Sequence, residues 1–167
     1  MLEVRTATHQ DIPELMEIFR KARGIMRSSG NLHQWNESYP SEEIIKNDID
    51  SGNSIVLCCD GRIIATMAFI PGPDPTYARI YEGEWPNELP YHVIHRIAVN
   101  APGQGVAVKL LDWAFCKIGK GPAAIRIDTH KDNVIMQHIL KKYGFTYCGI
   151  IHLANGDPRD AYIKTQA

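Results

Sequence analysis

The sequence predicts one mixed α/β domain over residues 1–167, in which a single sheet combines parallel and antiparallel strands. Its 167 residues and 44% hydrophobic content suffice for one core, and 22% charged residues suit a soluble surface. Apolar runs of strand length alternate with stretches whose apolar residues have helical spacing. One strand–helix–strand unit, residues 91–129, implies two parallel strands joined by a right-handed crossover, whereas the flanking hairpins are antiparallel.

The first half of the chain predicts a strand, two helices and a β-hairpin. Apolar residues at helical spacing indicate an amphipathic helix, for which Thr8 offers an N-cap oxygen and Pro13 fits the first turn. Ser41 is placed to cap a second, shorter helix. The turn Asp60-Gly61 joins two strand-like runs into a hairpin. The expected elements are a strand at 2–6, a helix from 12 to about 27, a helix after 41, and strands at 54–59 and 62–70.

The second half predicts four strands and two helices, after a proline-rich loop that begins at 71–75 and runs to 90. Asp132 is expected to cap the last helix, and Gly144 to close it. The overall order is therefore β-α-α-β-β-β-α-β-α-β-β. The expected elements are a strand at 91–99, a helix after the glycine turn that follows, a strand at 123–129, a helix ending near 143, and strands at 145–151 and 159–165.

Charge and cysteine content argue against several classes of partner and location. The formal net charge of −1 gives no reason to expect nucleic acid or an anionic membrane as a partner. No stretch approaches the roughly 18 apolar residues that span a bilayer, and the N-terminus lacks the basic start and apolar core of a secretion signal. The four cysteines show no CxxC or Cys/His metal spacing, which predicts reduced thiols and a cytoplasmic location.

An unusual junction separates the strand at 91–99 from the helix after it. Five residues that favour an open backbone, Ala-Pro-Gly-Gln-Gly at 101–105, precede that helix. Amides at a helix start have no partners inside the helix and, together with the helix dipole, suit phosphate oxygens. No Gly-Lys-Ser/Thr closes the turn, and Val108 stands where the dinucleotide fingerprint has its third glycine. Taken alone, the residues leave a pyrophosphate site and a plain tight turn both open.

The sequence around this junction resembles the GNAT superfamily of N-acyltransferases. The family's coenzyme A motif ends in Gly-x-Gly/Ala at a strand-to-helix turn, which is Gly105-Val106-Ala107 here. About 25 residues later the family has an Asn that opens a helix closing with Gly-Phe, here Asn133 and Gly144-Phe145. The opening residues 4–19 also resemble the family's first strand and helix. The resemblance implies a GNAT-like domain in which the two central parallel strands splay apart, with acetyl-CoA as cosubstrate.

The resemblance also implies where the cofactor binds. The pantetheine arm would lie along the strand at 97–99 as though it were an added strand. The Asn133 side chain would reach the pantetheine amides; the alternative is an ordinary residue of the helix's first turn. Pro102 departs from the family, which often has Arg or Gln there, so one side-chain contact to phosphate is missing. The cofactor-binding residues implied are Ile97, Ala98, Val99, Gly103, Gln104, Gly105, Val106, Ala107, Val108 and Asn133.

Acyl transfer to an amine requires a group that removes a proton from the nitrogen. His95 is the predicted base, because strand histidines at the matching position serve in a proton relay in some arylalkylamine acetyltransferases that the sequence resembles. Strand alternation is expected to place it on one face with Val93, Ile97 and Val99. A buried structural histidine is the alternative, and His92 is the reserve base.

The acid that protonates the leaving thiolate is less well defined by the sequence. The family's usual tyrosine position holds Leu140. Tyr143, one turn later on the same helix face, is the candidate acid, with a core residue as the alternative. A thiolate that leaves unassisted, or takes its proton from water, is also consistent with the sequence.

Aromatic residues in the two long loops are the candidate acceptor pocket, since these loops border the acceptor site in the family. Glu82 and Glu84 are weaker candidates for attracting a cationic amine, and Asp128, His130 and Asp132 suggest a strand end and N-cap more than a metal site. No metal is expected. The predicted pocket residues are Trp35, Tyr39, Tyr81 and Trp85.

These observations predict an N-acetyltransferase that transfers the acetyl group of acetyl-CoA to a primary amine of a small molecule or protein by direct attack. A non-catalytic acyl-CoA-binding module is the alternative, since Pro102 and Leu140 stand at two familiar side-chain positions. A binder of some other phosphate ligand that uses the same turn is a third. A monomer or a homodimer paired through the C-terminal hairpin fits the sequence equally.

Overall fold

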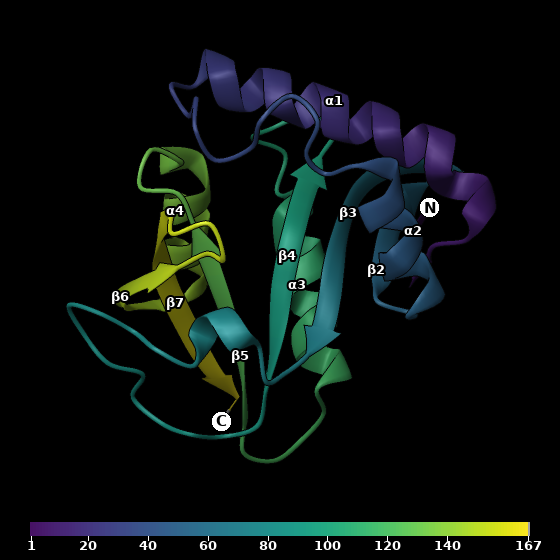
Figure 1. The fold of residues 1–167 in the computed structure, drawn as a ribbon. Coiled ribbons are helices and arrows are strands. Elements are labelled where there is room, and N and C mark those ends of the chain that lie inside the picture. The colour runs from purple at the N-terminus through teal and green to yellow at the C-terminus, as the bar shows by residue number, and fades with distance from the viewer. Residues whose placement is uncertain (167) are drawn as a thin grey trace.

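The computed structural model describes residues 1–166 and places helices on both faces of a seven-stranded sheet (Figure 1). The strand order is β1-β2-β3-β4-β5-β7-β6, in which β4 and β5 run parallel and all other neighbours run antiparallel. The elements are β1 (Leu2–Thr6), α1 (Ile12–Ser28), α2 (Glu42–Asp50), β2 (Ser54–Cys59), β3 (Arg62–Pro71), β4 (Tyr91–Val99), α3 (Val106–Lys117), β5 (Ala123–Thr129), α4 (Val134–Tyr143), β6 (Thr146–His152) and β7 (Pro158–Gln166).

The mixed sheet and the element order confirm the predicted fold class. Two short 3₁₀ turns, His9–Asp11 and Pro75–Tyr77, are additions that the sequence analysis did not include. The second of them lies within the proline-rich loop, because the Asp74 carboxylate accepts a hydrogen bond from the amide of Thr76 and starts the turn.

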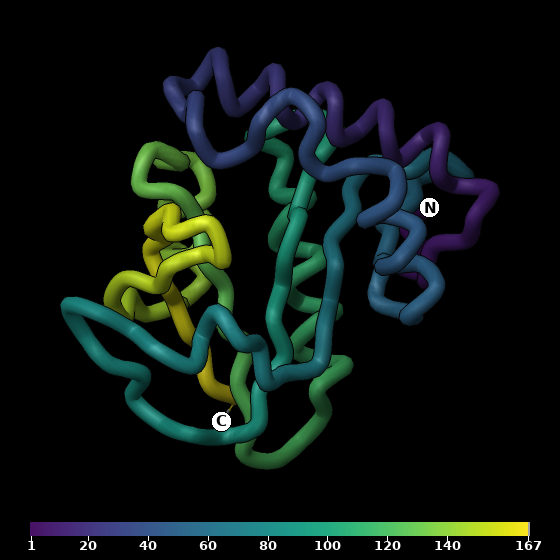
Figure 2. Tube along the Cα trace, in the orientation of Figure 1, coloured from purple at the N-terminus to yellow at the C-terminus, as the bar shows by residue number. Residues whose placement is uncertain are grey.

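The two halves of the sheet separate along the parallel pair. β4 and β5 are paired only from Tyr91 opposite Ala124 to Ile94 opposite Ile127, although β4 continues to Val99. Figure 2 shows the two chain segments close together at one end and diverging toward the other. The expected splay is therefore present, and the edge of β4 beyond Ile94 has no strand partner on the β5 side among residues 1–166.

Helices cover the sheet on both sides and bury separate cores. Buried residues of α3 and α4, including Leu110, Leu111 and Leu140, pack with Ile94 and Ile127 on one face. The opposite face carries the core of α1 and α2. Burial of these apolar side chains is the main source of stability, and it fixes the central strands between two layers.

Helix caps show where local sequence reasoning succeeds and where it fails. Ser41 caps α2 by accepting from the amide of Ile44 at 3.2 Å, as predicted. Thr8 is the N-cap of the 3₁₀ turn His9–Asp11, which leads into α1, and it forms a capping box with Asp11, whose carboxylate accepts from the Thr8 amide at 2.7 Å. The prediction that Asp132 caps the last helix is wrong, because Asn133 occupies that position and its side chain accepts from Met136.

Two further observations concern the helices and the cysteines. None of the helices described in residues 1–166 is both long and apolar enough to cross a membrane. All four cysteines are free thiols, of which Cys58 and Cys148 are buried.

Candidate active site

A bulge in β4 sets the direction of the side chains around the splay. His95 lies opposite Ala68 and Ala98 lies opposite Thr66, so two residues of β4, Arg96 and Ile97, share one position of β3. Arg96 has a positive φ of 52°, the left-handed region that favours glycine. An extra residue of this kind switches the following side chains to the other face of the strand.

The bulge overturns one prediction about strand faces. His95 keeps the face of Val93, which packs with Tyr77 and Ile151. Ile97 and Val99 instead pack against the core of α3 and α4 on the opposite face. The prediction that His95 shares a strand face with Ile97 and Val99 is therefore wrong. The extra residue of the bulge shifts the alternation of side chains by one position, so that Ile97 and Val99 point to the other face.

A cleft of about 520 Å³ opens where β4 and β5 separate. Its walls come from the two strands, the start of α4, the loop between α1 and α2, and the loop between β6 and β7. The strand residues that line it are Ile94, His95, Arg96, Ile97, Ala98 and Val99 of β4 and Ile127, Asp128 and Thr129 of β5.

The glycine turn lies at the end of this cleft. Pro102 and Ala107 line the cleft directly. Gly103 and Gly105 have φ values of 82° and 69°, a conformation that requires glycine for low strain, and Gly105 is the N-cap of α3. Within residues 1–166, the amides of residues 103–108 find no hydrogen-bond acceptor. They are therefore free to bind an anion at the positive end of the helix dipole.

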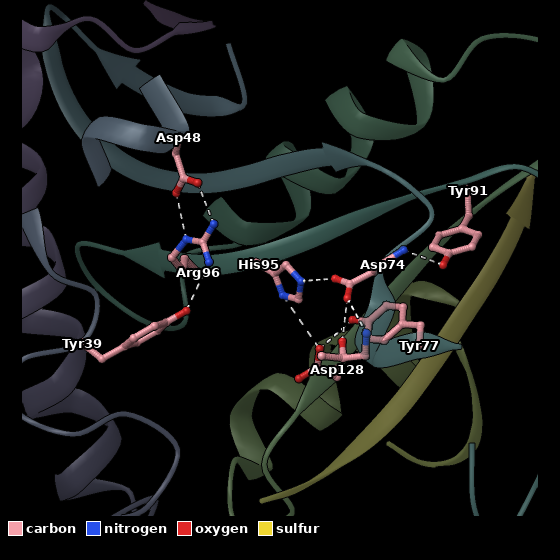
Figure 3. Close-up of polar contacts among 9 residues, drawn as sticks. Tyr39, Asp48, Asp74, Tyr77, Tyr91, His95, Arg96 and Asp128 are labelled. Carbon is pink, nitrogen blue, oxygen red and sulfur yellow. Dashed lines mark hydrogen bonds and ion pairs between the residues drawn. The ribbon is translucent and has the colours of Figure 1, made fainter. Parts of the chain in front are cut away.

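His95 is held between two carboxylates, as Figure 3 shows. Its Nε2 lies 2.9 Å from Oδ2 of Asp74, and its Nδ1 lies 3.8 Å from Oδ2 of Asp128. The hydrogen bond from His95, helped by bonds from Thr76, lowers the pKa of Asp74 to about 2, so this carboxylate stays ionised at neutral pH. Because the ionised Asp74 carboxylate accepts a hydrogen bond from Nε2, it favours the His95 tautomer that carries its proton on Nε2. The lone pair of Nδ1 is then free to accept a proton.

Tyr77 fixes the second carboxylate. Its hydroxyl donates to Oδ2 of Asp128 at 2.6 Å (Figure 3), and its side chain is fully buried. Burial, with the negative charge of Asp128 beside it, raises the pKa of Tyr77 well above its ordinary value. Tyr77 therefore remains a hydrogen-bond donor, and Asp128 is held at the cleft beside the imidazole.

A second polar cluster anchors the bulge. The Arg96 guanidinium donates twice to Asp48 of α2, from Nη2 at 2.7 Å and from Nε at 2.8 Å. Its Nη1 donates to the Tyr39 hydroxyl at 3.2 Å, as drawn in Figure 3. The bidentate pair with Asp48 holds α2 against Arg96, the residue with the left-handed backbone, and the bond to Tyr39 holds the α1–α2 loop there as well.

The comparisons with known proteins agree with this geometry. A model of the acetyltransferase (GNAT) family matches residues 12–145. A crystal structure of a GNAT-family acetyltransferase from Streptococcus agalactiae is 35% identical, with 99% of this chain and 96% of that chain covered and a TM-score of 0.86. The chain belongs to the GNAT acetyltransferase family. Members of this family use acetyl-CoA.

Two solved structures of lower identity share the fold. The Drosophila melanogaster polyamine N-acetyltransferase, described as catalysing the formation of N-acetylagmatine, is 14% identical, with 99% of this chain and 100% of that chain covered and a TM-score of 0.67. The NatC complex bound to Gag peptide and CoA is 12% identical, with 99% of each chain covered and a TM-score of 0.67. A search of curated proteins finds no match to the chain.

Five of the ten predicted cofactor-binding residues line the cleft, whereas Gly103, Gln104, Gly105, Val106 and Val108 of the glycine turn do not. Ile97, Ala98 and Val99 line it along the unpaired edge of β4. Asn133 also lines it, but both of its polar groups are engaged: Oδ1 accepts from Met136 at 3.0 Å, and Nδ2 donates to Gln34 at 2.9 Å. Each atom keeps one further position, a second N–H on Nδ2 and a second lone pair on Oδ1, with which Asn133 can contact a pantetheine amide.

Two of the four aromatic residues expected in the GNAT acceptor pocket lie in the cleft. Trp35 and Tyr39 line it from the α1–α2 loop. Tyr81 stacks on His152 with ring centroids 4.7 Å apart, and Trp85 donates to the backbone carbonyl of Tyr77. Neither Tyr81 nor Trp85 lines the cleft, because both anchor the long β3–β4 loop against the sheet.

The other histidine candidates serve local contacts. His92 stacks on Phe69 with centroids 4.5 Å apart and does not line the cleft. His130 accepts at Nδ1 from the amide of Asp132, as expected where a strand runs into a helix start. No three His, Cys, Asp or Glu side chains within residues 1–166 converge as metal ligands would.

Tyr143, the candidate acid, is not brought together with the other residues. Its hydroxyl donates to Oδ1 of Asp112 on α3 at 2.6 Å, and its ring packs on Phe115. Burial, together with the hydrogen bond to Asp112, raises its pKa. Leu140, at the family's tyrosine position, is fully buried in the core.

Replacing Tyr143 by phenylalanine should leave acetyl transfer within about twofold of the wild-type rate, because this hydroxyl does not reach the cleft. Stability should fall by about 1 kcal/mol through loss of the bond to Asp112. Steady-state kinetics and thermal unfolding measure the two effects. A tenfold or greater fall in kcat at an unchanged fold would place Tyr143 in the chemical step.

Asp74 and Asp128 are the site residues that the sequence analysis missed. Asp74 lies in a proline-rich loop far along the chain from His95, and Asp128 was assigned only to a strand end. The sequence held one usable signal, which is that Asp128 is an acidic residue within a mostly apolar strand, 123–129. Nothing local in the sequence links Asp74 to the histidine.

Proposed function

We propose that this GNAT domain is an N-acetyltransferase that transfers the acetyl group of acetyl-CoA directly to a primary amine of a small molecule or protein. The observation that carries the proposal is that one cleft is lined by the unpaired edge of β4 and by His95, which is bonded to the Asp74 carboxylate, and ends at the free amides of residues 103–108. The Drosophila relative, described as a polyamine N-acetyltransferase, supports an amine acceptor. We expect the enzyme to be cytoplasmic, as its reduced cysteines predict.

The residues present fit coenzyme A. The amides of Gly103 to Val108 would hold the pyrophosphate without a side chain at Pro102, since backbone N–H groups alone bind anions. The free edge of β4 at residues 97–99 would bond the pantetheine amides as an added strand does. Bound acetyl-CoA supplies the activated acetyl group. Its thioester would lie beside the part of β4 that carries His95.

His95 is the proposed base. The Asp74 carboxylate holds the proton on Nε2, so Nδ1 accepts a proton from the acceptor ammonium, directly or through one water. The neutral nitrogen then attacks the thioester carbonyl, so that an N–C bond forms and the C–S bond breaks. The thiolate leaves and takes a proton from water, because Leu140 offers no acid; the amide nitrogen loses its second proton to solvent. The strand around Val99 would provide a backbone N–H donor for the developing oxyanion.

Gly105→Ala should weaken acetyl-CoA binding about tenfold, measured as Kd by titration calorimetry. An alanine at a φ of 69° is strained by about 1–2 kcal/mol, and relieving that strain turns the amides of the N-cap away from the anion. Gly52→Ala is the matched control, because Gly52 has a φ of 74°, equally open surroundings and a position outside the cleft. Equal Kd values for both variants would contradict the assigned anion site.

The activity itself is tested by incubating the protein with acetyl-CoA and a broad panel of primary amines while free thiol is measured. We expect acetyl-CoA turnover with at least one amine. A non-catalytic acyl-CoA-binding module is the second candidate, favoured by Leu140 at the usual tyrosine position. Such a module would bind acetyl-CoA by calorimetry yet release no thiol with any amine. Failure to bind acetyl-CoA at millimolar concentration would contradict both the acetyltransferase and the binding-module proposals.

A further inference from the structure

A buried arginine, Arg159, lines the cleft, and three of its five N–H donors make no hydrogen bond within residues 1–166. Arg159 is only 5% exposed, lies at the start of β7 and contributes to the cleft lining. Its Nη1 donates to the carbonyl of Pro158 at 2.8 Å, and its Nη2 donates to the carbonyl of Gln34 at 3.0 Å. A guanidinium has five N–H donors, so three remain available.

Arg159 also lacks a carboxylate partner. No carboxylate within residues 1–166 forms an ion pair with it at 4.0 Å or less, whereas Arg96, the other arginine of the cleft, is paired with Asp48. Burial lowers the pKa of Arg159, and the negative charges of Asp128 and Asp157 offset only part of that effect. A buried, unpaired guanidinium is unfavourable for folding, and an anionic ligand that fills the remaining donors would offset that cost.

The sheet register places Arg159 on the same face as the proposed base. Asp128 of β5 lies directly opposite Ala161 of β7, so their side chains share a face. Arg159, two residues before Ala161, shares that face as well. Diagonal neighbours of this kind lie about 7–8 Å apart, within reach of a long side chain such as that of arginine. The Asp128 carboxylate in turn lies 3.8 Å from Nδ1 of His95.

We propose that the acceptor is a small amino acid, whose carboxylate binds the free donors of Arg159 while its amine faces Nδ1 of His95. This inference rests on the proposed acetyltransferase activity and names its substrate class. The planar fork of a guanidinium matches a carboxylate through two parallel hydrogen bonds. In the transfer, the amine nitrogen gains the acetyl group, His95 takes the first proton and the carboxylate stays unchanged.

The charges around the site favour this acceptor over a polyamine. A second ammonium group at this end of the cleft would meet Arg159 instead of a free carboxylate. Asp74 and Asp128 are already engaged by His95 and Tyr77. Asp132 and Asp157 also line the cleft, but Asp132 lies 3.6 Å from Nδ1 of His130, and Asp157 accepts a bond from Asn155 on the exposed β6–β7 turn.

The first test compares each L-amino acid with its own carboxamide as acceptor for the wild-type enzyme and acetyl-CoA. We expect kcat/KM for the best free acid to exceed that for its amide by 100-fold or more. Amine basicity cannot produce this preference, because loss of the carboxylate lowers the pKa of the amine and exposes more of the neutral nucleophile. Equal rates, or a preference for amides or polyamines, would overturn the proposal while leaving the acetyltransferase activity in place.

The second test changes the arginine. Arg159→Gln should lower kcat/KM for the free acid by about 100-fold, mainly through KM, and leave the rate with the amide nearly unchanged. Arg159→Lys, which keeps the charge but loses the fork, should retain an intermediate preference. Arg126→Gln is the matched control: Arg126 is also 5% exposed and bonded to one backbone carbonyl, but it lies between Trp85 and Tyr91 outside the cleft.

These outcomes separate the ligand from the reaction. If Arg159→Gln lowers the rates with acid and amide equally, which is the pattern expected of Arg126→Gln through loss of stability alone, the arginine is structural and the proposal fails. If no amine is acetylated, calorimetric titration of the amino acids into the CoA-saturated protein decides: binding of an acid but not its amide supports carboxylate recognition and rejects the activity. If neither the acid nor its amide binds, carboxylate recognition and acetyltransferase activity are both rejected.

Discussion

Replacement of His95 by alanine is expected to lower kcat/KM for the amine acceptor by 10²-fold or more, with acetyl-CoA affinity unchanged. A positioned general base contributes about this factor to proton transfer. His95 lies at the point where β4 leaves β5, with Nε2 held by Asp74 at 2.9 Å. Steady-state kinetics with saturating acetyl-CoA, together with calorimetry of cofactor binding, separate a chemical defect from a binding defect.

The pH profile adds a second readout for the same variant. The pKa of Asp74 is lowered to about 2, so its carboxylate is ionised throughout an assay between pH 5 and 9 and contributes no limb there. If His95 accepts the proton, the pH dependence of the rate should differ between the wild type and the variant. An unchanged profile and rate in His95→Ala would remove the histidine from the mechanism.

His92→Ala is the matched control on the same strand. His92 stacks on Phe69 and does not line the cleft. Its removal should lower stability through lost packing, with little change in turnover by the folded protein. Equal kinetic loss in the two variants would indicate that the strand as a whole, and not the His95 imidazole, supports the reaction.

Replacement of Asp48 by alanine is expected to destabilise the fold by about 3 kcal/mol or more, because it leaves the Arg96 guanidinium buried without its partner. The two side chains are 12% and 13% exposed and form two hydrogen bonds of 2.7 and 2.8 Å. For a chain of this length the melting temperature should fall by about 6–12 °C. Thermal unfolding followed by circular dichroism measures the change.

Glu42→Ala provides the comparison on the same helix. Glu42 and Lys46 form an ion pair of 3.3 Å with side chains 57% and 49% exposed. Exposed pairs of this kind contribute less than about 1 kcal/mol, so this variant should melt within a few degrees of the wild type. If Asp48→Ala were as stable as Glu42→Ala, the Arg96 pair would not be the anchor of the bulge.

Sequence patterns predicted the fold well where each pattern has a local cause. The hairpin turn Asp60-Gly61, the Ser41 cap and the closing glycine at Gly144 are all set by residues within a few positions of one another. The strand at 91–99 and its crossover to 123–129 followed from apolar runs that no other element explains. Such features depend on propensities that a single chain segment carries by itself.

The β4 bulge could not be predicted, because its cause lies outside the strand. Arg96 adopts a left-handed backbone while its side chain is fixed by Asp48, 48 positions earlier in the chain. Alternation over 91–99 therefore assigned Ile97 and Val99 to the wrong face. In the same way, the partner of His95 comes from a loop 21 residues before it, and sequence spacing gives no information on that contact.

The glycine turn was the most informative part of the candidate site. Its meaning comes from the backbone, and positive φ values at Gly103 and Gly105 agree with the expected open turn. The catalytic side chains were harder to predict from the sequence. Tyr143 lies on the same helix face as Leu140, as its spacing indicated, but its hydroxyl bonds to Asp112 on the neighbouring helix. Spacing defines the face of a helix, whereas tertiary packing decides which cavity that face meets.

The central claim is that free amides between Gly103 and Val108 hold the pyrophosphate of coenzyme A. An NMR titration of ¹⁵N-labelled protein with CoA tests it most directly, because each amide reports its own hydrogen bond. We predict saturable shifts of the amide signals of Gly103, Gly105 and Ala107, with that of Gly52 unmoved. Saturable binding that leaves these three signals in place, or no binding at millimolar CoA, would contradict the account.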